Sequence, residues 1–330
     1  MSAKTNQDPV SLTAEKFPIR DGVVHISPDR EYKMDREKAA HHFQQYMNLP
    51  IDKEQISNTA NRFKKLFSDL NILTDGSYFE IGCGTGRGTF PFVQDFRYDQ
   101  YLITDGMREF VDVTKANLER VRADAPVTYG VMTAEEIDKL PDAPFSLIVL
   151  FACLHHISDW RSFIQLAADR LAPGGALIMA EPVYEYQLVV GTLMSGLKQK
   201  HERGLVSLSQ DQLRWVQLQI NSADFMSSRI IDKEDREDKW TFRVDEVMMA
   251  AVRAGLQPYA FPGVGAGGPT GHKAVFSNMF KNRLKQLRAD DELIETILEE
   301  CSGELEFLDK IYLYGLGPHF NALYILRKPD

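Results

Sequence analysis

The chain is predicted to fold as an α/β protein whose mainly parallel sheet is doubly wound, with helices on both faces. Three observations lead to this prediction. From Ser77 onward, short apolar strands alternate with helical or turn segments five times in succession. The segment Phe145–Phe151 (FSLIVLF) is apolar almost throughout, as expected of a central parallel strand buried on both faces. The first of these strands ends in a loop with a glycine at every second position from Gly82 to Gly88.

The alternation defines most of the predicted elements. The five strands are Tyr78–Ile81, Tyr101–Thr104, Val127–Val131, Phe145–Phe151 and Ala176–Ala180. Helical segments are predicted from the glycine loop to about Phe96, from Arg108 to Ala123, at the turn Ala134–Lys139, and from the capping residue Asp159 to Leu171. Farther along, Val244–Ala254 predicts an amphipathic helix, and Leu256–Phe261 and Phe320–Arg327 predict the sixth and seventh strands.

The remaining segments surround this core. At the N-terminal side, Phe17–Ser27 alternates around the turn signal Asp21-Gly22 and predicts a short hairpin, and Lys38–Met47 and Asn58–Leu70 have helical spacing. Tyr184–Ser228 is mostly helical, as are 275–287 and 291–313. We therefore divide the chain into an extension (1–70), a core (71–183), a helical cap insertion (184–241) and the end of the core (242–330), which contains a second insertion at about 263–318.

Composition and charge argue against some classes of partner and indicate the cellular compartment. The formal net charge of −9 over 330 residues argues against a nucleic-acid partner, whose phosphates are neutralised by Lys and Arg. No apolar run reaches the roughly 20 residues that span a membrane. The three cysteines are far apart and form no C-x-x-C pair, which indicates neither a disulfide framework nor a zinc finger. We expect a cytoplasmic protein without a membrane partner.

The glycine loop is the strongest signal of a ligand. Glycines after the first strand of such a sheet allow a ligand to approach backbone amides. The NAD pattern G-x-G-x-x-G fits nowhere in this loop. The pattern present is acidic-x-G-x-G-x-G, from Glu80 through Gly82 and Gly84 to Gly86.

This pattern resembles motif I of the class I S-adenosylmethionine-dependent methyltransferases. The resemblance continues in register through Asp105-Gly106-Met107, Thr133-Ala134-Glu135, Leu154-His155-His156 and Leu171-Ala-Pro173-Gly174-Gly175. It implies a Rossmann-like sheet of seven strands, mostly parallel with the last antiparallel. It also implies S-adenosyl-L-methionine as cofactor, with Asp105 accepting hydrogen bonds from the ribose hydroxyls. The cofactor-binding residues by this resemblance are Glu80, Gly82, Gly84, Gly86, Asp105, Gly106, Met107, Thr133, Ala134 and Phe151.

Three residues are candidates for catalysis. His155 and His156 follow the fourth strand at the sheet edge where such folds bind ligands. The segment His155-His-Ile-Ser-Asp159 also resembles small-molecule O-methyltransferases, in which the first histidine is the general base. Glu181 ends the fifth strand and is expected to face the same cleft, either to orient the acceptor or to cap the next segment. The sequence shows no metal-ligand spacing, and no metal is predicted.

The resulting hypothesis is a methyltransferase that acts on an oxygen, nitrogen or carbon nucleophile of a small molecule. The helical insertions are expected to enclose the substrate or to form a homodimer interface. Two alternatives stay open: an RNA or protein methyltransferase, and a protein that binds S-adenosylmethionine without transferring its methyl group. The acceptor itself is not determined by the sequence, because fold does not fix function.

Overall fold

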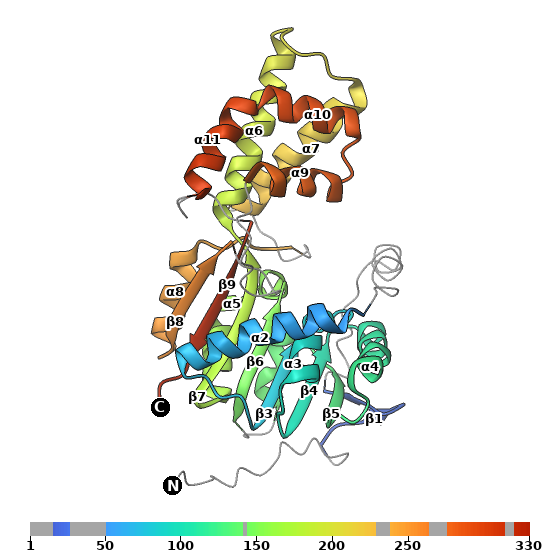
Figure 1. Cartoon of the computed structure of the whole chain (residues 1–330), viewed down its shortest axis with the longest axis vertical. Helices are drawn as coiled ribbons and strands as arrows, with labels where there is room; N and C mark the ends of the chain where they lie inside the picture. Colours follow the sequence, from blue (N-terminus) through green and yellow to red (C-terminus); the bar gives the residue numbers. More distant parts are fainter. Residues whose placement is uncertain (1–15, 27–50, 141–143, 229–237, 264–275, 314–319) are drawn as a thin grey trace.

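The computed structural model describes residues 16–26, 51–140, 144–228, 238–263, 276–313 and 320–330. Its strands are β1 (Ile19–Arg20), β2 (Val23–His25), β3 (Ser77–Ile81), β4 (Gln100–Asp105), β5 (Val127–Val131), β6 (Phe145–Phe151), β7 (Leu171–Pro182), β8 (Gln257–Pro262) and β9 (Asn321–Arg327). They form one sheet in the order β1-β2-β5-β4-β3-β6-β7-β9-β8. The expected doubly wound α/β architecture is confirmed (Figure 1).

The number of strands differs from the prediction. The seven predicted strands are present, with β9 antiparallel to both β7 and β8 as the family resemblance implies. The N-terminal hairpin, predicted as a separate extension, adds two more strands to the sheet. Its turn is made by Asp21 and Gly22, both with positive φ, and Val24 of β2 pairs in parallel with Gly130 of β5. The hairpin thereby covers backbone groups that an edge strand would expose.

In the described part of the chain, five α-helices and two short 3-10 helices lie around the sheet. They are α2 (Lys53–Leu70), α3 (Phe90–Asp95), α4 (Arg108–Arg122), α5 (Trp160–Arg170), α8 (Val244–Arg253), η1 (Ala134–Lys139) and η2 (Leu154–His156). Apolar residues of α2, α3 and α4 belong to one buried cluster, and those of α5 and α8 to another. Strand β6 contributes to both in alternation: Ile148 and Leu150 to the second, Leu147 and Val149 to the first. The apolar run predicted from sequence is therefore buried on both faces.

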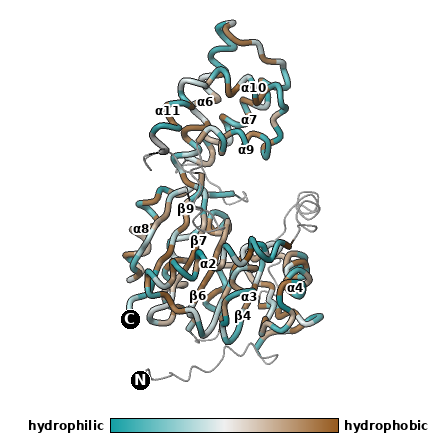
Figure 2. The backbone as a smooth tube through the Cα atoms, in the orientation of Figure 1, coloured by the Kyte–Doolittle hydropathy of each residue, from teal (hydrophilic) through white to brown (hydrophobic). Residues whose placement is uncertain are grey.

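The other five described helices form a bundle at one end of the sheet (Figure 1). They are α6 (Tyr184–Glu202), α7 (Gln210–Ser227), α9 (Phe276–Gln286), α10 (Asp291–Glu300) and α11 (Ser302–Leu313). Their buried residues, among them Leu197, Phe280 and Ile297, make a third apolar cluster of their own. Along these helices hydrophobic and hydrophilic stretches alternate, as expected for helices that bury one side (Figure 2).

Several helix boundaries have local causes. Asp52 accepts hydrogen bonds from the backbone N–H groups of Glu54 and Gln55, so α2 begins earlier than the predicted Asn58. The segment 291–313, predicted as one helix, is two helices, α10 and α11, separated at Cys301. The apolar spacing continues across this break, which is why periodicity did not reveal it.

Two predicted features lie outside the described residues: the helix Lys38–Met47 and almost all of the glycine-rich segment from Gly263 to Lys273. Within the described part of the chain, no helix is both long enough and apolar enough to cross a membrane.

Candidate active site

A cavity of about 330 Å³ opens at the carboxyl ends of four neighbouring parallel strands, β5, β4, β3 and β6. Its walls come from the loop after each strand. The lining residues are Ile81, Gly82, Gly84, Asp105, Gly106, Met107, Phe110, Met132, Thr133, Ala134, Glu135, Phe151, Ala152, Cys153, His156 and Ile157. This is the edge at which open α/β sheets bind ligands.

Eight of the ten predicted cofactor residues line this cavity: Gly82, Gly84, Asp105, Gly106, Met107, Thr133, Ala134 and Phe151. Glu80 and Gly86 do not. Sequence reasoning missed Phe110, Met132, Cys153 and Ile157, among others, although most of the missed residues directly adjoin predicted ones. The signal that could have found them is position, because every residue just past the end of these strands lies close to the ligand edge.

Gly82 meets two requirements that favour glycine, one from its backbone conformation and one from a close contact with the neighbouring loop. Its φ of +73° lies in the left-handed region that side chains disfavour. A Cβ placed there would also lie 2.8 Å from Sγ of Cys153, in the loop after β6. The absence of a side chain therefore lets the β3 and β6 loops approach each other at the wall of the cavity.

Asp105 links the glycine loop after β3 to the residues after β4 by hydrogen bonds. Its side chain is buried, with Oδ2 accepting from the backbone N–H of Gly84 and Oδ1 from that of Met107, each at 2.9 Å. Burial raises its pKa to about 6, although the backbone N–H groups of Gly84 and Met107 act in the opposite direction. Each carboxylate oxygen has a second lone-pair direction for a ligand hydroxyl in the cavity.

Glu80 lies in β3, two residues before Gly82 of the glycine loop, and does not line the cavity. Its carboxylate is buried and accepts a hydrogen bond from the hydroxyl of Tyr78 at 3.0 Å. Burial raises the pKa of Glu80 to about 7, against the lowering effect of its hydrogen bonds. Gly86, with φ of +83°, is packed against Phe90 and Thr114. Both residues shape the loop rather than line the cavity.

The three predicted catalytic residues lie in one cluster, but Glu181 is fully buried and supports His155 instead of facing the cavity. Glu181 is fully buried at the end of β7, and its Oε1 accepts from the backbone N–H groups of Cys153 and Leu154 at 3.0 and 2.8 Å. Its Oε2 lies 2.6 Å from Nδ1 of His155. The expectation that Glu181 faces the cleft is therefore wrong, because its carboxylate is turned inward to fix η2 and the ring of His155.

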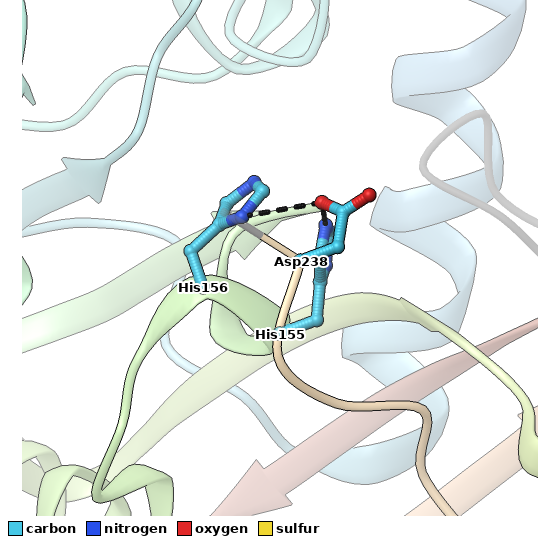
Figure 3. A group of neighbouring side chains, drawn as sticks. All are labelled: His155, His156 and Asp238. Carbon is cyan, nitrogen blue, oxygen red and sulfur yellow. Dashed lines mark ion pairs between the residues drawn. The ribbon is translucent and has the colours of Figure 1, made fainter. Parts of the chain in front are cut away.

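A residue not predicted from sequence completes the cluster. Oδ1 of Asp238 lies 3.4 Å from Nε2 of His155 and 3.4 Å from Nδ1 of His156 (Figure 3). The backbone N–H groups of Lys239 and Trp240 donate to the carbonyl of His155, and Nε1 of Trp240 donates to the carbonyl of Ile157. These bonds place Asp238 beside the histidines although it follows the first two bundle helices in the sequence.

The two carboxylates decide the charge of His155. Burial alone lowers its pKa, but Glu181 and Asp238 outweigh burial and raise the pKa of His155 to about 10. The same contact with His155 lowers the pKa of Asp238. At neutral pH His155 is therefore an imidazolium between two carboxylates. A general base must be unprotonated, so this charge state does not suit the base role predicted for His155.

Comparison with known proteins agrees with this geometry. Residues 79–177 match a family model described as a methyltransferase domain. The chain is 25% identical over 121 residues to the ubiquinone biosynthesis O-methyltransferase of Bradyrhizobium sp., covering 37% of this chain and 46% of that protein. It is 27% identical over 125 residues to the 27-O-demethylrifamycin SV methyltransferase of Amycolatopsis mediterranei, covering 37% and 44%. The chain thus spans less than half the length of these curated relatives.

Among solved structures, an S-adenosylmethionine-dependent methyltransferase from Clostridium acetobutylicum aligns with a TM-score of 0.46 and 11% identity, over 89% of this chain and 99% of that one. The family match begins within β3 and ends within β7, before Glu181, and it includes the loops after β3, β4, β5 and β6 that line the cavity. The chain therefore contains a class I methyltransferase domain whose cofactor is S-adenosylmethionine.

Proposed function

We propose that this protein transfers the methyl group of S-adenosylmethionine to an oxygen of a small molecule that has an acidic hydroxyl. The observation that carries the proposal is that the predicted cofactor residues and the histidine cluster lie at the same edge of the sheet. The predicted cofactor residues line a cavity, and His156 of the histidine cluster is part of the same lining. The methyl donor and a group able to hold an acceptor would thus be neighbours.

In this proposal Asp105 accepts hydrogen bonds from the ribose hydroxyls, and the loop at Gly82 and Gly84 receives the methionine part of the cofactor. Thr133 and Ala134, after β5, border the adenine. The buried Asp105 carboxylate supports this assignment, because both oxygens are held by backbone N–H groups and the residue lines the cavity. Such preorganisation lowers the cost of binding.

The histidines lie on the acceptor side. The imidazolium of His155 donates from Nε2 to the acceptor oxygen, which takes the place of Asp238, and stabilises that oxygen as an anion. His156 borders the path between acceptor and methyl group. Glu181 is a positioning residue that fixes the ring of His155. The acidic hydroxyl would bind as its oxyanion, with its proton already lost to solvent. S-adenosylmethionine would supply the methyl group to this oxygen, and the electron pair of the broken carbon–sulfur bond would stay on sulfur.

Oxygen is preferred over nitrogen and carbon for two reasons. A cationic donor stabilises an oxyanion, whereas it does not assist a neutral amine as nucleophile. The two curated relatives described above are, by name, a ubiquinone biosynthesis O-methyltransferase and a 27-O-demethylrifamycin SV methyltransferase. These names guide the choice of acceptors to test. A homodimer through the bundle helices stays a prediction, to be checked by light scattering coupled to size-exclusion chromatography.

The test begins with calorimetric titration of S-adenosylmethionine. Transfer of its labelled methyl group is then measured into a panel of phenols, enols, amines and carbon acids, with products identified by mass spectrometry. Methyl ethers of acidic hydroxyl compounds are the expected products. N-methyl or C-methyl products would contradict the choice of oxygen. Binding without transfer to any small molecule, RNA or protein fraction would contradict methyl transfer itself.

The role of His155 is tested separately with His155→Ala and His155→Gln. Both are expected to lower kcat by about 100-fold or more, the usual contribution of one oxyanion-stabilising donor, while cofactor affinity persists. Gln, which can still donate a hydrogen bond, is expected to retain more activity than Ala. Unchanged kcat in His155→Ala would overturn the assignment.

A further inference from the structure

The cluster of His155, His156 and Asp238 has a second property that methyl transfer does not require. Each of these residues offers one ligand atom, and the three atoms lie within 4.8 Å of one another. In Figure 3 both dashed ion pairs meet at the same carboxylate of Asp238, with the two imidazole rings facing it from neighbouring positions of η2. Two imidazole nitrogens and one carboxylate oxygen are ligands that zinc and other divalent transition metals take.

We propose that Nε2 of His155, Nδ1 of His156 and Oδ1 of Asp238 bind a Zn²⁺ ion at the rim of the cofactor cavity. Zinc holds nitrogen and oxygen ligands at about 2.0–2.1 Å in tetrahedral geometry, which separates any two ligand atoms by about 3.3 Å. The observed separations from Oδ1 of Asp238 to the two ring nitrogens are both 3.4 Å. Two of the three separations therefore match a tetrahedral site, and the third, between the two ring nitrogens, is within 4.8 Å.

The support around His155 matches a second feature of zinc sites. A histidine ligand usually donates its other ring N–H to a carboxylate, which fixes the ring and the tautomer. Nδ1 of His155 lies 2.6 Å from Oε2 of the fully buried Glu181, whose other oxygen is held by two backbone N–H groups. This arrangement leaves Nε2 of His155 as the atom that faces Asp238.

The backbone that follows Asp238 is fixed by hydrogen bonds, whereas the side chain of Asp238 is exposed to solvent. The segment that follows it is fixed by the hydrogen bonds of Lys239 and Trp240 to the η2 region, and its own side chain is 59% exposed. An ion could therefore enter from solvent. Three protein ligands leave one position of a tetrahedral ion open, as in catalytic rather than structural zinc sites. His156 also lines the cofactor cavity, so the open position is available to water or to an oxygen of the acceptor. In the zinc-bound state the ion would take the place of the Nε2 proton of His155, and it would stabilise the acceptor oxygen instead of the hydrogen bond proposed above.

The proposal is tested without any methyl-transfer assay. The full chain is stripped with a chelator, dialysed and titrated with Zn²⁺ against a chromophoric chelator, and bound metal is counted by plasma mass spectrometry. One zinc per chain is expected. Co²⁺ in place of Zn²⁺ is expected to give the intense visible absorption of a tetrahedral site.

Asp238→Asn is the primary variant, because the exposed carboxylate can be neutralised without unfolding the sheet. It is expected to weaken zinc binding at least tenfold while the affinity for S-adenosylmethionine stays the same. Glu181→Gln, which weakens the support of His155 and of the backbone at Cys153 and Leu154, is expected to weaken zinc binding by about 10–100-fold. Asp211→Asn, on the exposed start of α7, is the matched control and should bind zinc as the parent does.

Two results would overturn the site: no stoichiometric zinc in the parent chain, or equal zinc affinity in the parent and Asp238→Asn. Because the readout is metal content and not turnover, a failure of the zinc site can be distinguished from a failure of the methyl-transfer proposal.

Discussion

The sheet and the helical bundle differ in what they bury. At the carboxyl ends of the strands the sheet buries three acids, Glu80, Asp105 and Glu181, together with His155. Among the described residues of the five bundle helices, the buried side chains are aliphatic, aromatic or methionine except for Gln219, and none is charged. Burying a charged group costs free energy unless the group is paired. Such groups therefore tend to occur at functional sites, where they bind a ligand or take part in a reaction.

This difference predicts which substitutions affect ligand binding and which affect the free energy of unfolding. Substitutions at the strand ends should change ligand binding and pH dependence, whereas substitutions in the bundle should change stability alone. The bundle has its own apolar cluster, so its packing does not depend on side chains of the cavity. The following variants test this separation, from the largest expected effect to the smallest.

Asp105→Ala is expected to weaken S-adenosylmethionine binding by about 100-fold or more. Two hydrogen bonds to a charged group, at about 1.5–3 kcal/mol each, would be lost, and the loops at Gly84 and Met107 would lose their common acceptor. The measurement is calorimetric titration. Asp211→Asn in the bundle is the control and should not change the dissociation constant. Equal affinity in Asp105→Ala would remove the ribose assignment.

Ile297→Ala is expected to lower the free energy of unfolding by about 2–5 kcal/mol, because it leaves a cavity in the bundle cluster. Cofactor affinity should stay within twofold of the parent. Leu218, which is 61% exposed on α7, gives the control Leu218→Ala, with an expected change within about 0.5 kcal/mol. Denaturant unfolding and calorimetry measure the two quantities. A tenfold loss of cofactor affinity in Ile297→Ala would show that the two regions are coupled.

Gly82→Ala is expected to destabilise the protein by about 2–3 kcal/mol, since it combines an unfavourable positive φ with the contact at Cys153. Gly204 has nearly the same φ, +71°, with open space around it, so Gly204→Ala isolates the backbone contribution of about 1 kcal/mol. Adding Cys153→Ala to Gly82→Ala should recover part of the difference. Equal losses in the two single variants would contradict a steric role for Cys153.

Glu80 is expected to make the cofactor-free protein less stable as the pH rises. Its pKa is raised from 4.5 to about 7 in the folded state, so the folded protein holds this proton more tightly. The stabilisation is fully present below pH 4.5 and is lost as the pH passes 7. Between about pH 5 and about pH 8 the loss due to Glu80 is roughly 2 kcal/mol.

Glu80→Gln cannot titrate, yet its amide oxygen can still accept from Tyr78. The variant should therefore lose less stability than the parent over this interval. Denaturant unfolding of both proteins at the two pH values measures the difference. Identical pH dependence in parent and variant would contradict the raised pKa.

The elements predicted well were those with local signals. Strands such as Phe145–Phe151 and caps such as Asp159 depend on residues next to one another in sequence. Eight of the ten predicted cofactor residues line the cavity for a related reason, since each lies just beyond or at the end of a strand. The addition of the hairpin to the sheet, through Val24 and Gly130, depends on pairing between distant segments and has no local signal.

The sequence by itself determined the α/β alternation and the glycine loop, because these depend on periodicity and on spacing within short segments, and the resemblance of that loop to motif I of the methyltransferases implied the cofactor. Only the tertiary structure decided that Glu181 turns inward and that Asp238 lies beside His155 and His156. The physical reason is that side-chain direction and the meeting of distant loops are set by packing. The cationic state of His155, and the zinc-bound state proposed as its alternative, both depend on that packing and not on any motif.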